Sequence, residues 1–521
     1  MTPNRRIFLN VIATYGRSLY ALIIGLLCGR WAYVSLGTID YGLLGLVGGL
    51  IAFVTFFNQL LATAVARFYA VNVGAAQRNG AEGVEQCKKW FNTALSIHWS
   101  VPSLLLLIGY PTGAWAVRNF FEIPADRIAD CVWVWRFSCL SCYVAMMNVP
   151  FAAMYNAKQE IAELTIYSFA TTTLNAIFLY WMVMHRGVWL VKYSLWTCLL
   201  AVVPNLLIGI RAVVKYKECR FDVRYLWSLE RYKELAVFAF ARFWWAFSPF
   251  VSSQGQAILI NKFLGPTYNA SKSVGLTVSS HANNLSSALS SAFSPAIMNM
   301  AGAGNDKEVR RLAFVVCRLG AAMVLVFAVP LMLEIDTVLT AWLTSPPPFA
   351  TELCLVILLR SVFDRMTEGY GMAIMGFGRG VMRYSWVIGW TGIATVAIAW
   401  ILFLCGLGMW SICIALLSTK AAGVLIRLKM GETLAELPSK RWLGDVLCPL
   451  LLVSLVASVV SFPIRFLLSA SLYRVGLTTI MCEVAMLPML WFFVFGVSER
   501  EYIFSRINKY LPGLGRKVGR K

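Results

Sequence analysis

The sequence predicts an all-α integral membrane protein of about 14 transmembrane helices, built as two six-helix lobes in parallel repeat plus two extra C-terminal helices. Three observations lead to this fold class. Of the 521 residues, 59% are apolar and only 14% charged, whereas a soluble domain carries about 25% charged residues. Apolar stretches of bilayer-spanning length, roughly twenty residues, follow one another along the whole chain. Short sequence matches also recur at one constant offset.

The first apolar run follows a basic N-terminus, as it does in a secretory signal peptide. Arg17 interrupts this run, no small-residue cleavage site follows, and further spans come at once, so we expect it to remain in the protein as a first helix. The later runs predict thirteen more spans. In chain order, the predicted spans lie near 10–33, 41–69, 90–111, 129–156, 162–184, 190–213, 233–261, 274–301, 312–333, 350–376, 383–405, 408–427, 444–468 and 475–497.

The orientation follows from the distribution of Lys and Arg among the short loops, because basic loops stay on the cytoplasmic side. With the N-terminus inside, the inner loops near 78–89, 211–224, 307–311 and 429–441 and the C-terminal tail are all basic. The outer loops at 34–40 and 334–349 contain no Lys or Arg. Both termini are therefore predicted to be cytoplasmic.

The internal repeat has an offset of 228 positions. Leu36-Gly37 recurs as Leu264-Gly265, Gly74-Ala75 as Gly302-Ala303, and Val101-Pro102 as Val329-Pro330. Six predicted spans fall within one period, so both copies enter the membrane in the same direction, and transporters with such repeats bind substrate at the repeat interface. The predicted domains are a lobe at 1–228, a lobe at 229–430, and two further spans with a basic cytoplasmic tail at 431–521.

Composition argues against a nucleic-acid partner and against a metal site. The formal net charge of +21 fits basic loops on anionic lipid, and no nucleic-acid-binding motif accompanies it. Among 13 cysteines only Cys139 and Cys142 form a CxxC pair, which lies in a predicted helix without a second pair. With three histidines in the chain, we expect no metal site and no cofactor.

Several segments resemble the polysaccharide transporter family. They are Leu36–Gly49 (LGTIDYGLLGLVGG), Ala66–Ala70 (ARFYA), Asn261–Ala270 (NKFLGPTYNA) and Ser294–Ile297 (SPAI). This family contains O-antigen flippases and belongs to a superfamily with multidrug and toxin extrusion proteins and lipid II flippases. The resemblance extends over roughly 1–430. It implies a flippase for lipid-linked oligosaccharide in the bacterial inner membrane, working in surface polysaccharide biosynthesis.

Five arginines within the spans are candidate substrate-binding residues, because a charge at the bilayer centre is costly and marks function by default. Arg17 and Arg242 differ by one helical turn from the repeat offset, so they project from the same face of equivalent helices. Arg136 and Arg360 form a second pair, and Arg67 stands in the family-like segment. Guanidinium groups bind phosphate oxygens in a bidentate fork, so these arginines predict capture of a pyrophosphate head group.

Asp364 and Glu368 are the clearest acids within a span. With Arg360 they stand at i, i+4 and i+8, beside Arg365, so the cluster can neutralise itself. Structural pairing is the favoured interpretation, and coupling to H⁺ or Na⁺ through these carboxylates is the alternative. Polar helix faces, such as the Ser-rich run 279–291, either line a cavity or join helices.

The favoured function is translocation of a polyprenyl-pyrophosphate-linked oligosaccharide by alternating access, with membrane lipids and a glycan polymerase and its chain-length machinery as partners. Within the same superfamily, a cation-coupled multidrug exporter or a lipid II flippase remains an alternative. A membrane-embedded polymerase or glycosyltransferase is disfavoured, because such reactions need acids and bases in a sizeable outer loop. The loop at 34–40 has one acid, Asp40.

Overall fold

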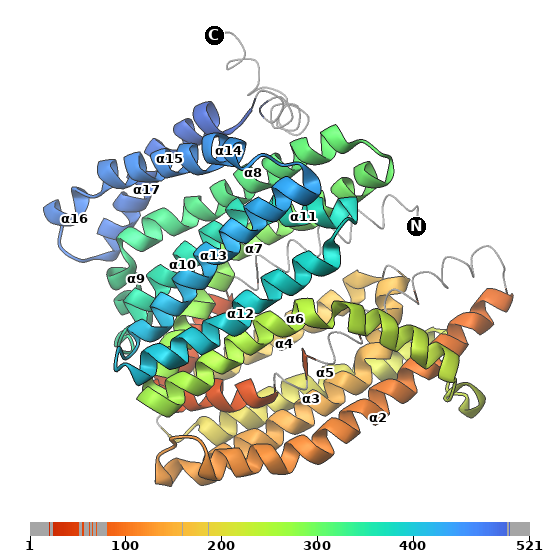
Figure 1. Cartoon of the computed structure of the whole chain (residues 1–521). Coiled ribbons are helices and arrows are strands. Elements are labelled where there is room, and N and C mark those ends of the chain that lie inside the picture. Colours follow the sequence, from red (N-terminus) through yellow and green to blue (C-terminus); the bar gives the residue numbers. More distant parts are fainter. Residues whose placement is uncertain are drawn as a thin grey trace, which may run out of the picture. The chain divides into compact units, whose positions relative to one another are not determined.

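The protein is all-α in the part of the chain that the structure describes (Figure 1). This computed structural model describes Tyr20, residues 24–51, a few residues between 55 and 69, residues 81–496 except 159 and 186, and Arg500. For some residues inside helices only the backbone is described. Ten helices in this part are long and apolar enough to cross a membrane. The prediction of a multi-span helical membrane protein is confirmed.

The chain forms two compact units. The first contains 1–273 and 396–411, and the second contains 274–395 and 412–521. The lobes predicted from the repeat, with boundaries at 228 and 430, remain a prediction about the sequence.

In the first unit, α3 packs against both α2 and α5, and α4 packs against α5 and α3 (Figure 1). The helical run Ile24–Ile51 precedes these helices. The bounds of the helices are α2 Ala81–Asn119, α3 Ile128–Ala157, α4 Ile161–Met184, α5 Leu190–Lys215 and α6 Leu229–Leu264, with short 3-10 turns η1 Ala125–Arg127, η2 Lys217–Cys219 and η3 Val223–Tyr225.

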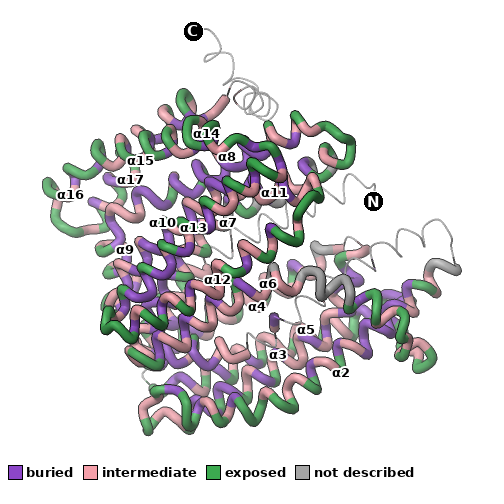
Figure 2. The backbone as a smooth tube through the Cα atoms, viewed as in Figure 1, coloured by how far each residue is buried: buried purple, intermediate pink, exposed green. Residues whose placement is uncertain are grey.

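In the second unit, α8 is the central helix, and α10, α11, α15 and α17 all pack on it. Figure 2 shows α8 as one of the most continuously buried helices. The bounds are α8 Asp306–Leu333, α9 Ile335–Leu343, α10 Ala350–Met366, α11 Glu368–Phe377, α12 Val381–Leu404, α13 Trp410–Ala435, α14 Ser439–Trp442, α15 Cys448–Ser461, α16 Ile464–Leu467 and α17 Leu472–Met489. The long helix α7, Pro266–Gly302, begins in the first unit and continues in the second.

The observed helices follow the predicted spans from 90–111 onward, with three local differences. The predicted span 350–376 is broken at Thr367 into α10 and α11. The predicted outer loop at 334–349 holds the short helix α9. Helices α6 and α7 are separated by Gly265 alone, where a longer connection was expected. Most of the first two predicted spans lies outside the described residues.

Matched positions of the repeat share their local geometry. Gly37 has a φ of 75° and Gly265 a φ of 86°, a region that glycine enters without the steric cost of a Cβ. Gly265 separates α6 from α7, whereas Gly37 lies within the helical run Ile24–Ile51. Pro102 lies inside α2 and Pro330 inside α8, so the third matched pair also occupies equivalent places.

The C-terminal helix α17 is fastened to the second unit by a buried ion pair. Arg474 donates to Glu334 at 2.7 and 3.1 Å, and the side chains are 8% and 1% exposed. Thr337 and Thr478 add hydrogen bonds to this pair. Since a buried charge needs full hydrogen bonding to be tolerated, this network fixes where α17 sits on the junction of α8 and α9.

Candidate functional site

Three of the five predicted substrate-binding arginines are untested. Arg17 and Arg67 lie outside the described residues, and Arg242 lies in α6 with its side chain outside the description. The predicted pairing of Arg17 with Arg242 therefore stays a prediction. The structure describes Arg136 and Arg360 in full.

Arg136 is an exposed cation within the spanning helix α3. Its guanidinium carbon lies 4.6 Å from the ring centroid of Trp133, and no ion pair joins it to a described residue. It stands eight residues into the helix, about 12 Å from its start at a rise of 1.5 Å per residue. A charge at such a depth faces a bundle interior or a wet cavity rather than lipid tails. Arg136 stays a candidate substrate-binding residue, as an exposed cation within a spanning helix.

In the second unit, Asp364 of α10 is held by two cations of α13. Lys420 donates to its Oδ1, and Arg427 lies 3.4 Å from the same oxygen. Arg427 also donates to the Thr367 hydroxyl at 3.0 Å, at the break between α10 and α11. These contacts join α10 to α13 through charge rather than through apolar packing alone.

Glu368 is held by Arg365, at 2.8 Å. The same guanidinium donates to Asn283 Oδ1 at 3.2 Å and to the Ser287 hydroxyl at 3.0 Å, both on α7. A hydrogen bond between the hydroxyls of Ser279 and Ser361, at 2.9 Å, continues this contact one turn further on. For these residues, the Ser-rich run of α7 joins helices.

Arg360 differs from its neighbours. It is half-buried and forms no hydrogen bond or salt bridge with a described residue, although its charge acts on Asp364. The cluster therefore contains four cations, Arg360, Arg365, Lys420 and Arg427, against the two carboxylates of Asp364 and Glu368. Neutralisation within the segment 360–368, the favoured sequence interpretation, describes the Arg365–Glu368 pair, which joins α10 to α11. It does not describe Asp364, whose salt bridges come from α13. An excess of two positive charges remains.

Lys420 and Arg427 are the functional candidates that sequence reasoning missed. They stand seven residues apart in the predicted span 408–427, and a spacing of seven puts both on one helix face. The rule that singled out the five arginines, a charge inside a span, applies to these two residues equally.

A cavity of about 720 Å³ adjoins the cluster. Lys420 forms part of its wall, together with Lys429 and Glu432. The remaining wall is mainly apolar and comes from α13 and the segment 442–447, with Leu417, Val424, Leu428, Trp442 and Leu447 among its residues. A charged group and an apolar chain can thus occupy adjoining places in this unit.

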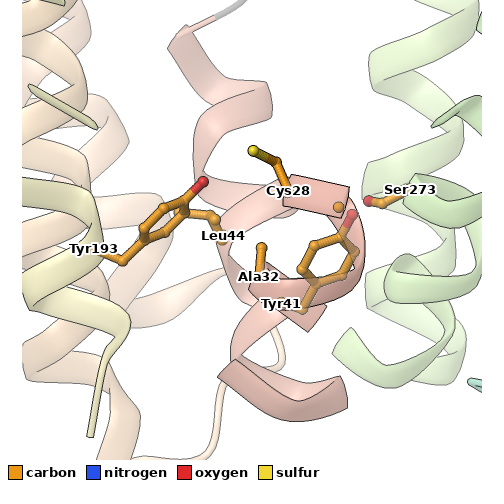
Figure 3. Close-up of a pocket in the computed structure, with 8 residues that line it drawn as sticks. Cys28, Ala32, Tyr41, Leu44, Tyr193 and Ser273 are labelled. Atoms are coloured by element: carbon orange, nitrogen blue, oxygen red, sulfur yellow. The ribbon is translucent and has the colours of Figure 1, made fainter. Parts of the chain in front are cut away.

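A smaller pocket, of about 280 Å³, lies in the first unit between the run 24–51, α5 and α7 (Figure 3). Tyr193 stands on one side, Cys28 and Tyr41 on the central helix, and Ser273 on the other side. No predicted site residue lines it. The described residues contain no group of three or more His, Cys, Asp or Glu side chains that could hold a metal ion.

Glycines bring the run 24–51 close to α6 and α7 at this place. A Cβ on Gly42 would lie 2.1 Å from the Pro266 carbonyl oxygen, and one on Gly45 would lie 2.8 Å from the Ser273 hydroxyl. A Cβ on Gly49 would lie 2.6 Å from Gln254 Oε1. These separations are too short for any larger residue without movement. At Gly42 the neighbouring atom belongs to the backbone, whereas at Gly45 and Gly49 it belongs to a side chain.

Together, the spans, the repeat and the charged cluster define the class of polytopic helical membrane proteins with intramembrane ionisable sites. No protein-family model and no curated protein sequence matches the chain. Among solved structures, the lipid II flippase MurJ in an inward closed conformation aligns with a TM-score of 0.68 at 12% identity, over 95% of this chain and 100% of that one.

Transporters of the multidrug resistance MATE family align as well. An inward-facing member of this family, described as part of the MOP superfamily, gives a TM-score of 0.62 at 17% identity, over 80% of this chain and 95% of that one. A MATE transporter in complex with MaL6 gives 0.57 at 15% identity, over 83% and 96%. The chain therefore shares the all-helical fold of these solved structures.

Proposed function

We propose that this protein is a flippase that moves a polyprenyl-pyrophosphate-linked oligosaccharide across the bacterial inner membrane by alternating access. The carrying observation is the cluster of α10 and α13, where two positive charges are unbalanced and Lys420 also borders an apolar cavity. A lipid-linked pyrophosphate has complementary parts: its anionic head group matches the positive charges, and its apolar chain matches the apolar cavity. Arg136 on α3 offers a further exposed cation within a span.

The mechanism assigns a role to each part of the site. Arginine keeps its charge and offers planar donors, so Arg360 would hold phosphate oxygens. Lys420 would sit where the head group meets the chain. The paired residues Asp364, Arg365 and Glu368 would hold α7, α10 and α13 in place around the head group. The glycan is proposed to serve surface polysaccharide synthesis, as in the resemblance to the polysaccharide transporter family.

The fold also suits a lipid II flippase or a cation-coupled multidrug exporter. An exporter of organic cations would need carboxylates free to meet its substrate, and Asp364 and Glu368 each hold cations of this chain. This observation favours an anionic substrate over a cationic one. Coupling of transport to H⁺ or Na⁺ through these acids remains a second proposal.

Deletion of the gene tests the function. We expect lipid-linked oligosaccharide to accumulate on the cytoplasmic leaflet and surface glycan to be lost, with both restored by the intact gene. Purified protein in liposomes should move a fluorescent lipid-linked oligosaccharide to the other leaflet and should leave a fluorescent organic cation where it is. Unchanged surface glycan in a deletion strain that has no second flippase would refute the proposal.

A further inference from the structure

The linker between α5 and α6, residues 216–228, is an ordered segment. Asn92 of α2 accepts a hydrogen bond from the Asp222 N–H at 2.8 Å and donates to the Arg220 carbonyl at 3.0 Å. Lys88 forms an ion pair with Asp222 at 2.7 Å, and this hydrogen bond lowers the pKa of Asp222 below its usual value.

Further along, the Ser96 hydroxyl donates to the Leu226 carbonyl at 2.8 Å. The contacts on α2 therefore fall at positions 88, 92 and 96, along one face of the helix. One side of the linker therefore contacts α2.

The other side is exposed and mixes large apolar residues with cations. Val223 is 67% exposed, Trp227 75% and Leu229 85%. Arg220 and Arg224 stand beside them, both exposed, and their side chains form no hydrogen bond or ion pair with a described residue. Figure 2 shows the exposed colour along much of the segment that follows α5. An ordered segment held with such residues outward points to an apolar and anionic surface.

The exposed apolar surface continues from α5 into the linker. Val203, Leu206, Ile210 and Val214 are all exposed along that spanning helix, at spacings of three or four residues that put them on one face. Such a stripe on a membrane helix meets lipid. Beyond the helix end at Lys215, the linker follows α2 along positions 88, 92 and 96 and presents two cations beside exposed apolar residues. This combination is typical of the level where a bilayer changes from acyl chains to head groups.

We propose that the exposed side of the linker, together with Leu229 at the start of α6, is a binding surface for anionic phospholipid. Trp227, Val223 and Leu229 lie at the acyl boundary, and Arg220 and Arg224 lie on the phosphates. Each such cation near an anionic surface contributes about 1 kcal/mol. The surface holds the connection between α5 and α6 at the bilayer. This inference requires only that the protein spans a membrane, and it is independent of the substrate.

A probe at position 223 tests the placement. Full-length Val223→Cys carries a bimane label, with the exposed native cysteines Cys405 and Cys448 replaced by Ser and the same label at Lys307→Cys as a water-facing control. In vesicles of phosphatidylcholine with phosphatidylglycerol, brominated acyl chains should quench the label at 223 and leave the label at 307 unquenched. Equal quenching of both labels by aqueous iodide, without quenching by lipid, would show that the surface faces water or a cytoplasmic protein.

Removal of the two arginine charges tests whether the surface binds anionic lipid. Arg220→Gln/Arg224→Gln removes two cations without touching the backbone groups that dock the linker, and Lys307→Gln/Lys440→Gln removes two exposed cations elsewhere. Native mass spectrometry should show an apparent affinity for phosphatidylglycerol about thirtyfold lower in the first pair, from about 1 kcal/mol per cation, and little change in the second. Equal loss in both pairs, or no loss in the first, would overturn the proposal.

Discussion

At the scale of single residues, the cations of the cluster differ in whether their side chains form hydrogen bonds or salt bridges with described residues. Arg365 holds Glu368, Asn283 and Ser287, so its donors are occupied by neighbouring helices. Arg360 has no such bonds with described residues, so under the proposed function its donors are open to the head group. Chemically identical side chains five positions apart thus have different expected consequences when removed.

We expect Arg360→Gln to lower transport in liposomes at least tenfold while leaving the thermal midpoint in detergent nearly unchanged. Charge-assisted hydrogen bonds to a phosphate are worth about 1.5–3 kcal/mol, which sets this magnitude. Arg360→Lys should restore only part of the rate, because it keeps the charge without the fork. A midpoint that falls in parallel with transport would assign Arg360 a structural role instead.

Arg365→Gln should show the opposite pattern, with a midpoint lower by a few degrees. The double variant Arg365→Gln/Glu368→Gln should be more stable than the sum of the single changes predicts, by about 0.5–3 kcal/mol, since the two residues share a contact. Thermal unfolding of the four proteins in one detergent measures this term. Strict additivity would mean that the 2.8 Å pair contributes nothing in solution.

The sequence predicts part of this site from the energetic cost of placing a charged side chain inside a membrane span. Asp364, Glu368 and Arg360 stand out because each is a charge inside an apolar run. The pairing of Asp364 with Lys420 joins residues 56 positions apart, and helix packing decides that contact. The local spacing suggested Arg360 as a partner because i and i+4 side chains can meet on one helix, but it carries no information on α13.

At the scale of elements, glycine controls how closely the run 24–51 meets α7. Gly42 and Gly48 lie in the same helical run, yet a Cβ on Gly42 would meet the Pro266 carbonyl, whereas a Cβ on Gly48 would meet nothing within 4 Å. In both places alanine has the higher helix propensity, by about 1 kcal/mol. Packing and propensity therefore oppose each other at Gly42 only.

We expect Gly48→Ala to raise the thermal midpoint slightly and Gly42→Ala to lower it. The first change gains helix propensity in open space, and the second forces the run 24–51 away from α7. Parallel unfolding measurements on the two variants provide the comparison, with the unmodified protein as reference. The same sign of shift in both variants would show that the close approach to Pro266 has no energetic weight.

Element prediction succeeded where hydropathy alone defines the helix. The spans from 90–111 to 190–213, the span 312–333 and those beyond 383 reappear as helices that are long and apolar enough to cross a membrane. The break at Thr367 and the short helix α9 were not predicted. Helices α10 and α11 pack on α8, and α9 packs on α10 and α17, and the local sequence carries no signal for such contacts. The one-residue connection at Gly265 depends on a positive φ at that residue. The sequence shows a glycine there but does not show which φ the glycine adopts.

At the scale of the whole molecule, charge on the loops sets the orientation in the membrane. The segment 215–233 carries Lys215, Lys217, Arg220, Arg224, Arg231 and Lys233, whereas 334–349 carries no Lys or Arg. Cytoplasmic retention of basic loops then predicts that the first segment is inside and the second outside. The structure describes Lys217 and Ser345 as exposed, so both positions can report on this assignment.

Cysteine labelling in intact cells therefore tests the orientation, with Cys28, Cys405 and Cys448 replaced by Ser to remove the native thiols that are not buried. A membrane-impermeant maleimide should label Ser345→Cys from outside and should reach Lys217→Cys only after the cells are permeabilised. The reason is the positive charge around position 217, which is retained on the cytoplasmic side. Since the two sites belong to one chain, the pair controls for expression and reactivity. Labelling of Lys217→Cys in intact cells, with protection of Ser345→Cys, would invert the orientation and put the lipid-binding linker on the outer leaflet.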